Sequence, residues 1–361
     1  MFAGEAFRQL VPATAPVKVL DCCAAPGGKS THLAGLLHPD SLLVCNEVIR
    51  SRVPLLTTNL DKWGYGNTAV TAADPEGFSH LTGYFDVILV DAPCSGEGLF
   101  RKDHGAISEW SAANANLCAL RQDRILSAVW PALKEGGLLI YSTCTWNPEE
   151  DEENISRFAL KHDARPEAIS TEQEWGIECV NRAGCMGYKF YPHLVQGEGF
   201  FLAALRKTTA ESSGSSRSRN AKRETWRDKD GLSKLLRQPE RFTLRVKSDV
   251  VYADPTVSIE DLDRIATAVP VLRSGLALGT ARHGKITPEH SLALSLELDP
   301  AAFPTAELSE ADALRFLRKD TLSLNGSGTT LVTFQEHGLG WVNILPGRVN
   351  NLLPMGWRIR M

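Results

Sequence analysis

The sequence lacks the features that mark membrane-spanning and exported proteins. None of its hydrophobic runs approaches the ~18 consecutive apolar residues of a membrane-spanning helix. Its first residues, MFAGE, contain no basic region followed by an apolar core, so they do not resemble a signal peptide. We therefore expect a soluble protein of the cytoplasm with no membrane partner.

Cysteine is absent beyond Cys185 and never occurs in C-x-x-C spacing. The chain has eight cysteines, and its two close pairs, 22–23 and 179/185, have the wrong spacing for a zinc site. In a chain with no export signal, thiols are expected to stay reduced. We therefore expect neither a disulfide framework nor a bound metal.

An excess of positive charge is also missing, because 39 Lys and Arg residues are outnumbered by 43 Asp and Glu residues. The net charge of −4 does not by itself indicate a nucleic-acid-binding protein. Positive charge is concentrated in residues 208–240, where a serine-rich stretch precedes Arg217, Arg219, Lys222, Arg223, Arg227 and Lys229. This composition is typical of a solvated linker, with contact to an RNA backbone as the alternative.

The first 207 residues alternate short apolar runs with helical patterns. Strands are expected at 17–20, 42–45, 70–71, 85–90, 138–141 and 199–205, and helices at 29–37, 50–63 and 112–130. A further helix is expected after Asn147, because Pro148 and the acidic residues that follow it favour a first helical turn. This alternation predicts an α/β domain over residues 1–207, with a Rossmann-like, doubly wound and largely parallel sheet.

Beyond the linker, the pattern changes to short strands separated by glycine-containing turns. Strands at 242–246 and 331–334 are the clearest, and helices are expected at 259–268 and 310–319. The sequence therefore predicts a second, smaller and mostly β domain over residues 241–361.

The segment DCCAAPGGKST, residues 21–31, joins the first expected strand to the first expected helix. Its small residues let a ligand approach the backbone N–H groups, and a helix N-terminus adds positive potential. Its ending, GKS, is that of a Walker A loop for a nucleotide phosphate, but Cys23 replaces the first glycine and Pro26 cannot donate an N–H. A P-loop nucleotide-binding protein is therefore the weaker interpretation of this segment.

An acidic residue follows each of the next three expected strands. Glu47 stands where ribose hydroxyls would need a carboxylate, Asp74 where an adenine contact is expected, and Asp91 near the amino-acid part of the ligand. Each acid alone could be a helix cap. Together with the glycine loop, the three acids favour S-adenosylmethionine as the cofactor.

Two cysteines, Cys94 and Cys144, lie directly after expected core strands, at the edge of the sheet where the cofactor would bind. Methylation of cytosine at C5 needs a thiolate that adds to C6, a group that contacts the base near N3, and a base for the C5 proton. Cys144, Cys94 and Asp91 are candidates for these roles, and Lys29 is a candidate for lowering a thiol pKa or orienting Asp91. Other cysteines are expected to be small buried side chains (Cys45, Cys118 and Cys179) or loop residues (Cys22 and Cys23).

Three blocks of the sequence, residues 20–29, 91–98 and 141–154, resemble the RNA cytosine-C5 methyltransferases. Two motif cysteines about one βαβ unit apart are specific to this family. The resemblance implies that Cys144 attacks C6, that Cys94 assists breakdown of the covalent adduct, and that Asp91 contacts both base and cofactor. It also implies that S-adenosylmethionine is bound by Cys23, Ala24, Ala25, Pro26, Gly27, Gly28, Lys29, Glu47, Asp74 and Asp91.

The C-terminal domain resembles the PUA-like RNA-binding domain of the bacterial ribosomal RNA branch of that family, through residues 272–279, 288–294, 338–341 and 348–354. The resemblance implies that the substrate is structured RNA, with ribosomal RNA first and transfer RNA as its nearest rival. A target cytosine in a stem would have to leave its stack to reach a thiolate. A non-catalytic RNA-binding assembly factor is the remaining alternative, against which the complete pair of cysteines weighs.

Members of this family usually carry a further N-terminal region, which forms an RNA-binding surface, ahead of the position that matches Met1. The resemblance therefore implies that this chain is a fragment of a longer protein or begins at a displaced start.

Overall fold

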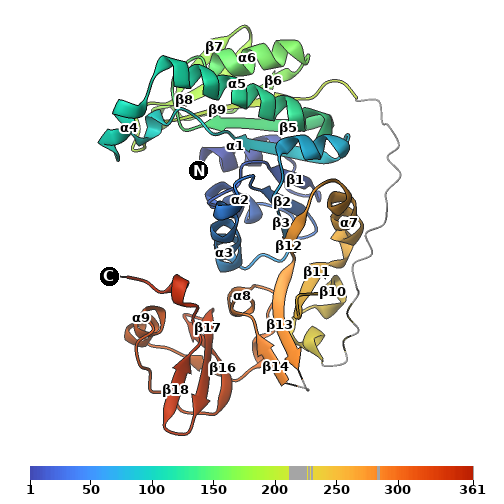
Figure 1. Ribbon diagram of the computed structural model, residues 1–361, viewed down its shortest axis with the longest axis vertical. Coiled ribbons are helices and arrows are strands. Elements are labelled where there is room, and N and C mark those ends of the chain that lie inside the picture. Colours follow the sequence, from blue (N-terminus) through green and yellow to red (C-terminus); the bar gives the residue numbers. More distant parts are fainter. Residues whose placement is uncertain (211–225, 227, 229–230, 283–284, 361) are drawn as a thin grey trace. The chain divides into compact units, whose positions relative to one another are not determined.

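The computed structural model describes residues 1–210, 226, 228, 231–282 and 285–360. The six basic residues noted above, between 217 and 229, lie outside the described residues. Contacts divide the chain into two compact units (Figure 1). Unit 1 comprises Met1–Thr57, Thr68–Ala221 and Asp261–Arg273, and unit 2 comprises Thr58–Asn67, Lys222–Glu260 and Ser274–Met361.

Unit 1 is built on a ten-stranded sheet. Its strands are β1 (Lys18–Asp21), β2 (Leu42–Asn46), β3 (Thr68–Thr71), β4 (Phe85–Asp91), β5 (Leu133–Thr143), β6 (Arg165–Glu167), β7 (Glu178–Arg182), β8 (Cys185–Phe190), β9 (Phe200–Arg206) and β12 (Val271–Ser274). Their order is β12-β3-β2-β1-β4-β5-β9-β8-β7, with β6 paired to β9. Strands β1 to β5 pair in parallel, whereas β6 to β9 join the sheet through antiparallel pairs.

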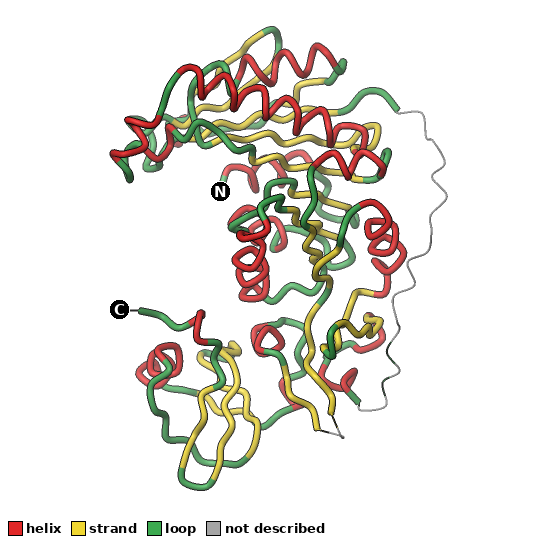
Figure 2. Tube along the Cα trace, viewed as in Figure 1, coloured by secondary structure: helices red, strands yellow, loops and turns green. Residues whose placement is uncertain are grey.

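Helices cover both sides of this sheet (Figure 2). The helices that lie wholly or partly in unit 1 are α1 (Phe2–Leu10), α2 (Gly28–Ala34), α3 (Val53–Trp63), α4 (His104–Glu109), α5 (Ala112–Val129), α6 (Glu152–Lys161) and α7 (Ile259–Ala268). Helices α5 and α6 contact each other and lie over β4 and β9, while α1 contacts α2 on the opposite side (Figure 1). Within the described ranges, no helix has the length and apolar character needed to cross a membrane.

The parallel strands are largely buried because helices lie on both faces of the sheet. Every residue of β2 is buried, and Leu20, Ile88 and Leu139 are at most 1% exposed. Helix α7 contributes Leu262 and Ile265 to the same hydrophobic core, although it lies far along the chain. The α/β fold class predicted from the alternation of strands and helices is therefore confirmed.

In the antiparallel part of this sheet, β9 was expected as the strand at 199–205, but the prediction has no strands at the positions of β6, β7 and β8. Strand β7 is an edge strand with mostly exposed, polar residues, so it lacks the hydrophobic run that marks a buried strand. Cys179 lies on this strand and is exposed, so the expectation that it is a small buried side chain is wrong. Cys45 and Cys118 are buried, as expected.

Helix α6 begins at Glu152 rather than directly after Pro148. Asn147 still caps a turn, because its Oδ1 accepts the backbone N–H of Glu150 at 3.0 Å. That turn precedes the helix and brings the Glu150 side chain into the interior, where it is fully buried. The capping signal is therefore present, but the helix that it predicts starts too early.

Unit 2 contains two four-stranded sheets, in the orders β10-β11-β13-β14 and β15-β16-β17-β18. Its elements are β10 (Phe242–Lys247), β11 (Val250–Pro255), β13 (Leu276–Arg282), β14 (Lys285–Pro288), α8 (His290–Leu294), β15 (Thr305–Glu307), α9 (Glu310–Arg318), β16 (Gly328–Phe334), β17 (His337–Leu345) and β18 (Arg348–Asn351). Two hydrophobic clusters lie in this unit: one joins Trp341 of β17 to residues of β10, β11 and β13, and the other contains Phe316 of α9. The mostly β class predicted for this part of the chain is confirmed.

The expected boundary between linker and second domain differs from the observed units. Residues Leu232–Leu235 form a helical turn, and Leu232 and Leu236 are buried in the core of unit 2, although they fall within the expected linker. Conversely, α7 and β12 fall within the expected second domain but pack in unit 1. Short segments on both sides of residue 241 therefore belong to a different unit from the one that composition suggests.

Candidate active site

Strands β1, β4 and β5 are parallel neighbours, so the residues after their C-terminal ends meet at one edge of the sheet. Asp91, the last residue of β4, lies opposite Ser142 of β5. Its Oδ1 accepts a hydrogen bond from the Ser142 hydroxyl at 2.8 Å, and its Oδ2 pairs with the Lys29 ammonium at 2.8 Å. These two contacts fix the orientation of the Asp91 carboxylate beside the glycine loop.

Cys94 and Cys144 follow β4 and β5 and meet at the same edge. Their Sγ atoms are 2.8 Å apart, with Cys144 exposed and Cys94 half-buried. The hydrogen bond from Cys94 lowers the pKa of the Cys144 thiol, and the charge of Lys29 adds to this effect, against the opposing effects of burial and Asp91. The same hydrogen bond, together with burial, raises the pKa of Cys94. Of the two thiols, Cys144 is therefore the one that loses its proton more readily.

Backbone hydrogen bonds join the two cysteine loops past the end of the strands. The Ala92 N–H donates to Ser142 O and the Gly98 N–H donates to Cys144 O, both at 2.8 Å. A Cβ at Gly98 would lie 2.5 Å from the Cys144 carbonyl oxygen, so this close approach requires glycine. The loops therefore meet backbone to backbone, which brings Cys94 next to Cys144.

The glycine loop closes over the end of β1 and is tied to β2. Gly27 has a φ of 109° immediately before α2, a conformation that favours glycine. The Ala24 N–H donates to Asn46 O at 2.8 Å, and the Asn46 side-chain amide donates to Cys22 O at 3.1 Å. Apart from its chain neighbours, no atom of the described residues lies within 4 Å of where a Cβ of Gly28 would be. The loop therefore leaves room for a ligand beside its backbone.

Glu47 follows β2, and its carboxylate is held from two sides. It accepts the Ile49 N–H at 2.8 Å and pairs with Arg52 at 3.3 Å. Arg52 also donates to Ala25 O at 2.6 Å, which links Glu47 to the glycine loop. Val48 and Ile49 are 54% and 48% exposed, so an apolar surface lies next to a fixed carboxylate.

Asp74 follows β3, but its carboxylate is engaged locally. It accepts the Glu76 N–H at 3.1 Å as the cap of the helical turn Pro75–His80, and it pairs with Arg124 at 3.2 Å. The Asn46 amide ties the neighbouring backbone to the same edge, because it donates to Ala73 O at 3.0 Å. In the structure, Asp74 acts as a helix cap. The contact with adenine that was expected of Asp74 stays a hypothesis.

The residues at this edge of the sheet fit S-adenosylmethionine. The fixed Glu47 carboxylate is the kind of acceptor that ribose hydroxyls need, and the exposed Val48 and Ile49 suit the face of an adenine ring. The Asp91 carboxylate offers negative charge to a sulfonium, and the space beside Gly28 lets a ligand approach the loop. Of these features, the sequence analysis missed Val48, Ile49, Arg52 and Asn46.

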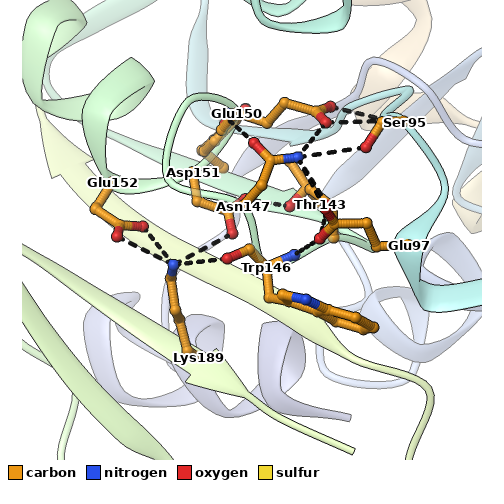
Figure 3. Close-up of polar contacts among 11 residues, drawn as sticks. Ser95, Glu97, Thr143, Trp146, Asn147, Glu150, Asp151, Glu152 and Lys189 are labelled. Atoms are coloured by element: carbon orange, nitrogen blue, oxygen red, sulfur yellow. Dashed lines mark hydrogen bonds and ion pairs between the residues drawn. The ribbon is translucent and has the colours of Figure 1, made fainter. Parts of the chain in front are cut away.

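Four buried polar residues that contact the loops of the two cysteines were also not predicted from the sequence, and Figure 3 labels Glu97, Asn147 and Glu150 among them. Glu97, Gln122, Asn147 and Glu150 are at most 7% exposed and are joined by hydrogen bonds. One partial signal was available, because Glu150 belongs to the acidic run after Pro148, which was interpreted only as a helix start.

Burial favours the protonated forms of the ionisable groups beneath the glycine loop. Burial raises the pKa of Asp21 to about 7, although the Ser30 hydroxyl donates to its carboxylate at 2.6 Å. The contact with Cys23 and burial raise the pKa of Cys22, and burial raises that of Cys45. These two thiols therefore stay protonated and are poor candidates for the nucleophile.

The family follows from comparison with known sequences. A family model described as 16S rRNA methyltransferase RsmB/F matches residues 9–206, more than half of the chain. The chain belongs to this family. A second model, described as the methyltransferase RsmF PUA domain, matches residues 303–359, which include both β16 and β17. The resemblance to RNA cytosine-C5 methyltransferases with a PUA-like domain is thereby confirmed, and the family is one of S-adenosylmethionine-dependent RNA methyltransferases.

Among its relatives are curated proteins named ribosomal RNA small subunit methyltransferase F. The protein from Shewanella loihica is 29% identical over 96% of this chain and 74% of its own length. The protein from Vibrio vulnificus is 30% identical over 93% of this chain and 73% of its own length. The protein from Pectobacterium atrosepticum is 41% identical, over 54% of this chain and 40% of its own length. The chain therefore matches about three quarters of the first two relatives and two fifths of the third.

Two solved structures are similar to part of this chain. The crystal structure of PH0851 is 26% identical to this chain, with a TM-score of 0.50, over 57% of this chain and 46% of its own. NSun6 from Pyrococcus horikoshii, crystallised with SFG, is 30% identical, with a TM-score of 0.49, over 57% of this chain and 52% of its own.

Proposed function

We propose that this RsmB/F family member transfers a methyl group from S-adenosylmethionine to C5 of a cytosine in small-subunit ribosomal RNA. The observation that carries the proposal is the pair of thiols, with Cys144 of lowered pKa 2.8 Å from Cys94, at the edge that holds Lys29 and Asp91. The names of the relatives support ribosomal RNA as the substrate, and the PUA-domain match supports RNA as the partner. Such a substrate implies an enzyme of the cytoplasm.

S-adenosylmethionine supplies an electrophilic methyl group on a positively charged sulfur. Its proposed contacts are Cys23, Ala24, Ala25, Pro26, Gly27, Gly28, Lys29, Glu47, Asp74 and Asp91. Glu47 accepts hydrogen bonds from the ribose, because Arg52 and the Ile49 N–H already hold its carboxylate in place. Asp74 contacts the adenine only if it gives up part of its pairing with Arg124.

In the first chemical step, the Cys144 thiolate attacks C6 of the cytosine and forms an S–C6 bond. The electron pair of the C5–C6 double bond then moves to C5, which takes up the methyl group. Asp91, held by Lys29 and Ser142, hydrogen-bonds the base near N3. As a carboxylate, Asp91 accepts this hydrogen bond from the amino group beside N3 and orients the base, while the positive charge of Lys29 offsets the charge that the attack by Cys144 pushes into the ring.

In the second step, Cys94 assists breakdown of the adduct. Before the attack, Cys94 shares its proton with the Cys144 thiolate, which raises the pKa of Cys94. Once Cys144 is an uncharged thioether, this cause is gone, and only burial still opposes the transfer of the Cys94 proton to solvent. The Cys94 thiolate then takes the C5 proton, the C5–H electron pair restores the double bond, and Cys144 leaves as a thiolate.

Substitution of each cysteine separates the two roles. We expect Cys144→Ala to abolish methyl transfer to small-subunit ribosomal RNA and to leave binding of radiolabelled S-adenosylmethionine unchanged. We expect Cys94→Ala to accumulate a covalent protein–RNA adduct, seen as a slow band on a denaturing gel. The control is Cys179→Ala, which removes an exposed thiol of β7 and should behave like the unsubstituted chain.

The same experiment contains the results that would overturn the proposal. Methyl transfer by Cys144→Ala would exclude this residue as the nucleophile. A Cys94→Ala variant that forms no adduct would exclude the role of Cys94 in adduct breakdown. Saturable binding of ATP in place of S-adenosylmethionine would favour the P-loop alternative.

A further inference from the structure

The strand ladder ends before either of the paired cysteines. The last paired residues of β4 and β5 at this edge are Asp91 and Ser142, so Cys94 and Cys144 lie on loops beyond the paired residues of the sheet. A separation of 2.8 Å between side chains on two such loops needs contacts that cross from one loop to the other. Two buried glutamates make contacts of this kind in opposite directions (Figure 3).

The first of them, Glu150, comes after Cys144 in the chain and reaches back to the loop of Cys94. Its side chain is fully buried, and its Oε2 accepts the backbone N–H of Ser95 at 3.0 Å. Ser95 is the residue next to Cys94. The carboxylate of Glu150 therefore fixes the backbone on which the Cys94 thiol stands.

Amide side chains occupy the remaining acceptor sites of Glu150. The Gln122 amide, from α5, donates to Oε2 at 2.7 Å, and the Asn147 amide donates to Oε1 at 2.7 Å. Gln122 also donates to Pro93 O at 3.1 Å, so it holds the Cys94 loop from a second point. The three groups of the described residues that hydrogen-bond the Glu150 carboxylate are all N–H donors.

The second glutamate, Glu97, lies on the loop of Cys94 and reaches the loop of Cys144. It is 5% exposed, and its Oε2 accepts the Thr145 hydroxyl at 2.7 Å and the Trp146 N–H at 3.0 Å. These two residues directly follow Cys144. Each cysteine loop therefore contributes one buried carboxylate that accepts hydrogen bonds from the other loop.

A buried lysine, Lys189, also contacts the loop of Cys144, as Figure 3 shows. The Lys189 ammonium, 2% exposed, donates to Trp146 O at 2.8 Å and pairs with Glu152 at 2.8 Å. The peptide after Trp146 is thus held by a cation, while Glu97 holds the Trp146 N–H. Lys189 and Glu152 therefore hold in place the part of the Cys144 loop that Glu97 contacts.

We infer that Glu97 and Glu150 are positioning residues that brace the two loops against each other and hold the Cys94 and Cys144 thiols at reacting distance. The inference rests on the proposed function, in which Cys94 acts on an adduct that Cys144 holds. Only an ionised carboxylate accepts hydrogen bonds at both oxygens and donates none. A glutamine at position 150 turns its NH2 group toward at least one of the N–H donors and opens the brace.

An open brace affects the two chemical steps differently. Attack by Cys144 on C6 needs one sulfur, whereas breakdown of the adduct needs both, and a misplacement of ~1 Å is enough to slow a reaction between held groups by about 100-fold. Loss of one carboxylate therefore slows adduct breakdown more than adduct formation. The covalent adduct accumulates even though both cysteines are present.

The test compares Glu150→Gln with Glu149→Gln in the full chain. Glu149 is the preceding acid of the same run, but its side chain is exposed, so the two variants change charge equally. With small-subunit ribosomal RNA, Glu150→Gln should slow adduct breakdown about tenfold or more and give the slow band of Cys94→Ala. Glu149→Gln should release RNA at the rate of the unsubstituted chain.

A second measurement needs no RNA and no cofactor. One molecule of glutathione disulfide oxidises the Cys94 and Cys144 thiols to a protein disulfide and is itself reduced to two molecules of glutathione. The equilibrium of this exchange reports the effective concentration of one thiol at the other, which Glu150→Gln should lower about tenfold. Glu97→Gln removes the carboxylate that crosses in the opposite direction and should lower the effective concentration by the same factor. It provides the test if Glu150→Gln does not fold.

The two measurements distinguish failure of the brace from failure of the proposed function. An unchanged disulfide equilibrium in folded Glu150→Gln and Glu97→Gln variants would overturn the brace. A lowered equilibrium constant for formation of the Cys94–Cys144 disulfide, with no adduct in either Glu150→Gln or Cys94→Ala, would support the brace and reject the proposed role of Cys94. A lowered equilibrium with an accumulated adduct would support both.

Discussion

The Cys144 thiol has a pKa below its ordinary value because Cys94 donates a hydrogen bond to it. Only the thiolate form reacts with an alkylating agent. Iodoacetamide should therefore modify Cys144 at a lower pH than an ordinary thiol, and Cys94→Ala should move the midpoint of this pH profile upward. Mass spectrometry follows both Cys144 and the exposed Cys179, which serves as the comparison. The same midpoint with and without Cys94 would contradict control by this hydrogen bond.

Asp21 makes stability depend on pH in a direction unusual for an acid. Burial raises its pKa in the folded chain to about 7, from an ordinary value of 3.8. Between these values the folded chain keeps the proton and the unfolded chain loses it, so the free energy of unfolding falls as pH rises. For one proton, the slope is at most about 1.4 kcal/mol per pH unit.

The neutral variant Asp21→Asn tests this coupling. Asparagine has nearly the same shape and still accepts the Ser30 hydroxyl, but it has no proton to lose. Urea denaturation between about pH 5 and about pH 8 should show a smaller decline of stability in the variant than in the unsubstituted chain. Two parallel pH profiles would mean that Asp21 is ionised in the folded protein.

Among the elements, the paired ends of β4 and β5 decide the geometry of the site. Their parallel register places Asp91 beside Ser142, and the two loops that follow meet through the hydrogen bond from Gly98 N–H to Cys144 O. A methyl group added at Gly98 would lie 2.5 Å from Cys144 O and 3.1 Å from Glu198 O. Neither obstacle is a flexible side chain, so the loops must separate.

Gly98→Ala should therefore reduce methyl transfer strongly, by about 100-fold if the loops separate by ~1 Å. The fold of unit 1 should persist, because the strands of the sheet are unaffected, and circular dichroism can verify this. Gly356→Ala is the control, since nothing among the described residues lies within 4 Å of the added methyl group. Equal activity of the two variants would show that the backbone contact does not position Cys144.

At the scale of the whole molecule, the two units share the chain in an interleaved way. Helix α7 lies after β10 and β11 of unit 2, yet its Ile265 side chain is fully buried in the core of unit 1. Strand β12 then pairs with β3 at the edge of the first sheet. Unit 1 is therefore incomplete without a segment from the C-terminal part of the chain.

Ile265→Ala should lower the stability of unit 1 by about 2–5 kcal/mol, the usual range for truncating a buried isoleucine. Hydrogen exchange should show the loss of protection in strands such as β2 and β4, rather than in β16 and β17 of unit 2. Val257→Ala, at a position 62% exposed, should leave both units unchanged. Loss of protection confined to unit 2 would contradict the observed assignment of α7.

Features that depend on local pattern could be predicted from the sequence. The alternation of buried strands with helices gave the α/β class, because hydrophobic periodicity is a property of neighbouring residues. The same alternation located the glycine loop and placed Asp91, Cys94 and Cys144 after core strands. The resemblance of three motif blocks named the family, which the comparisons confirmed.

Features that depend on pairing between distant segments could not be predicted in this way. Strand β7 has no hydrophobic run because it is an exposed edge, and α7 has the same amphipathic pattern whichever core it joins. Likewise, nothing in the acidic run after Pro148 distinguishes Glu150, which is buried, from Glu149, which is exposed. The difference arises from one extra turn ahead of α6 and from donors supplied by α5 and the Cys94 loop.

The sequence by itself determined which reactive side chains this protein contains and which strands they follow. The tertiary structure alone decided that the sulfurs of Cys94 and Cys144 meet at 2.8 Å and that Glu97 and Glu150 each cross to the opposite loop. The physical reason is that spacing along a chain sets local conformation, whereas the separation of groups about 50 residues apart is set by the order and register of the strands between them.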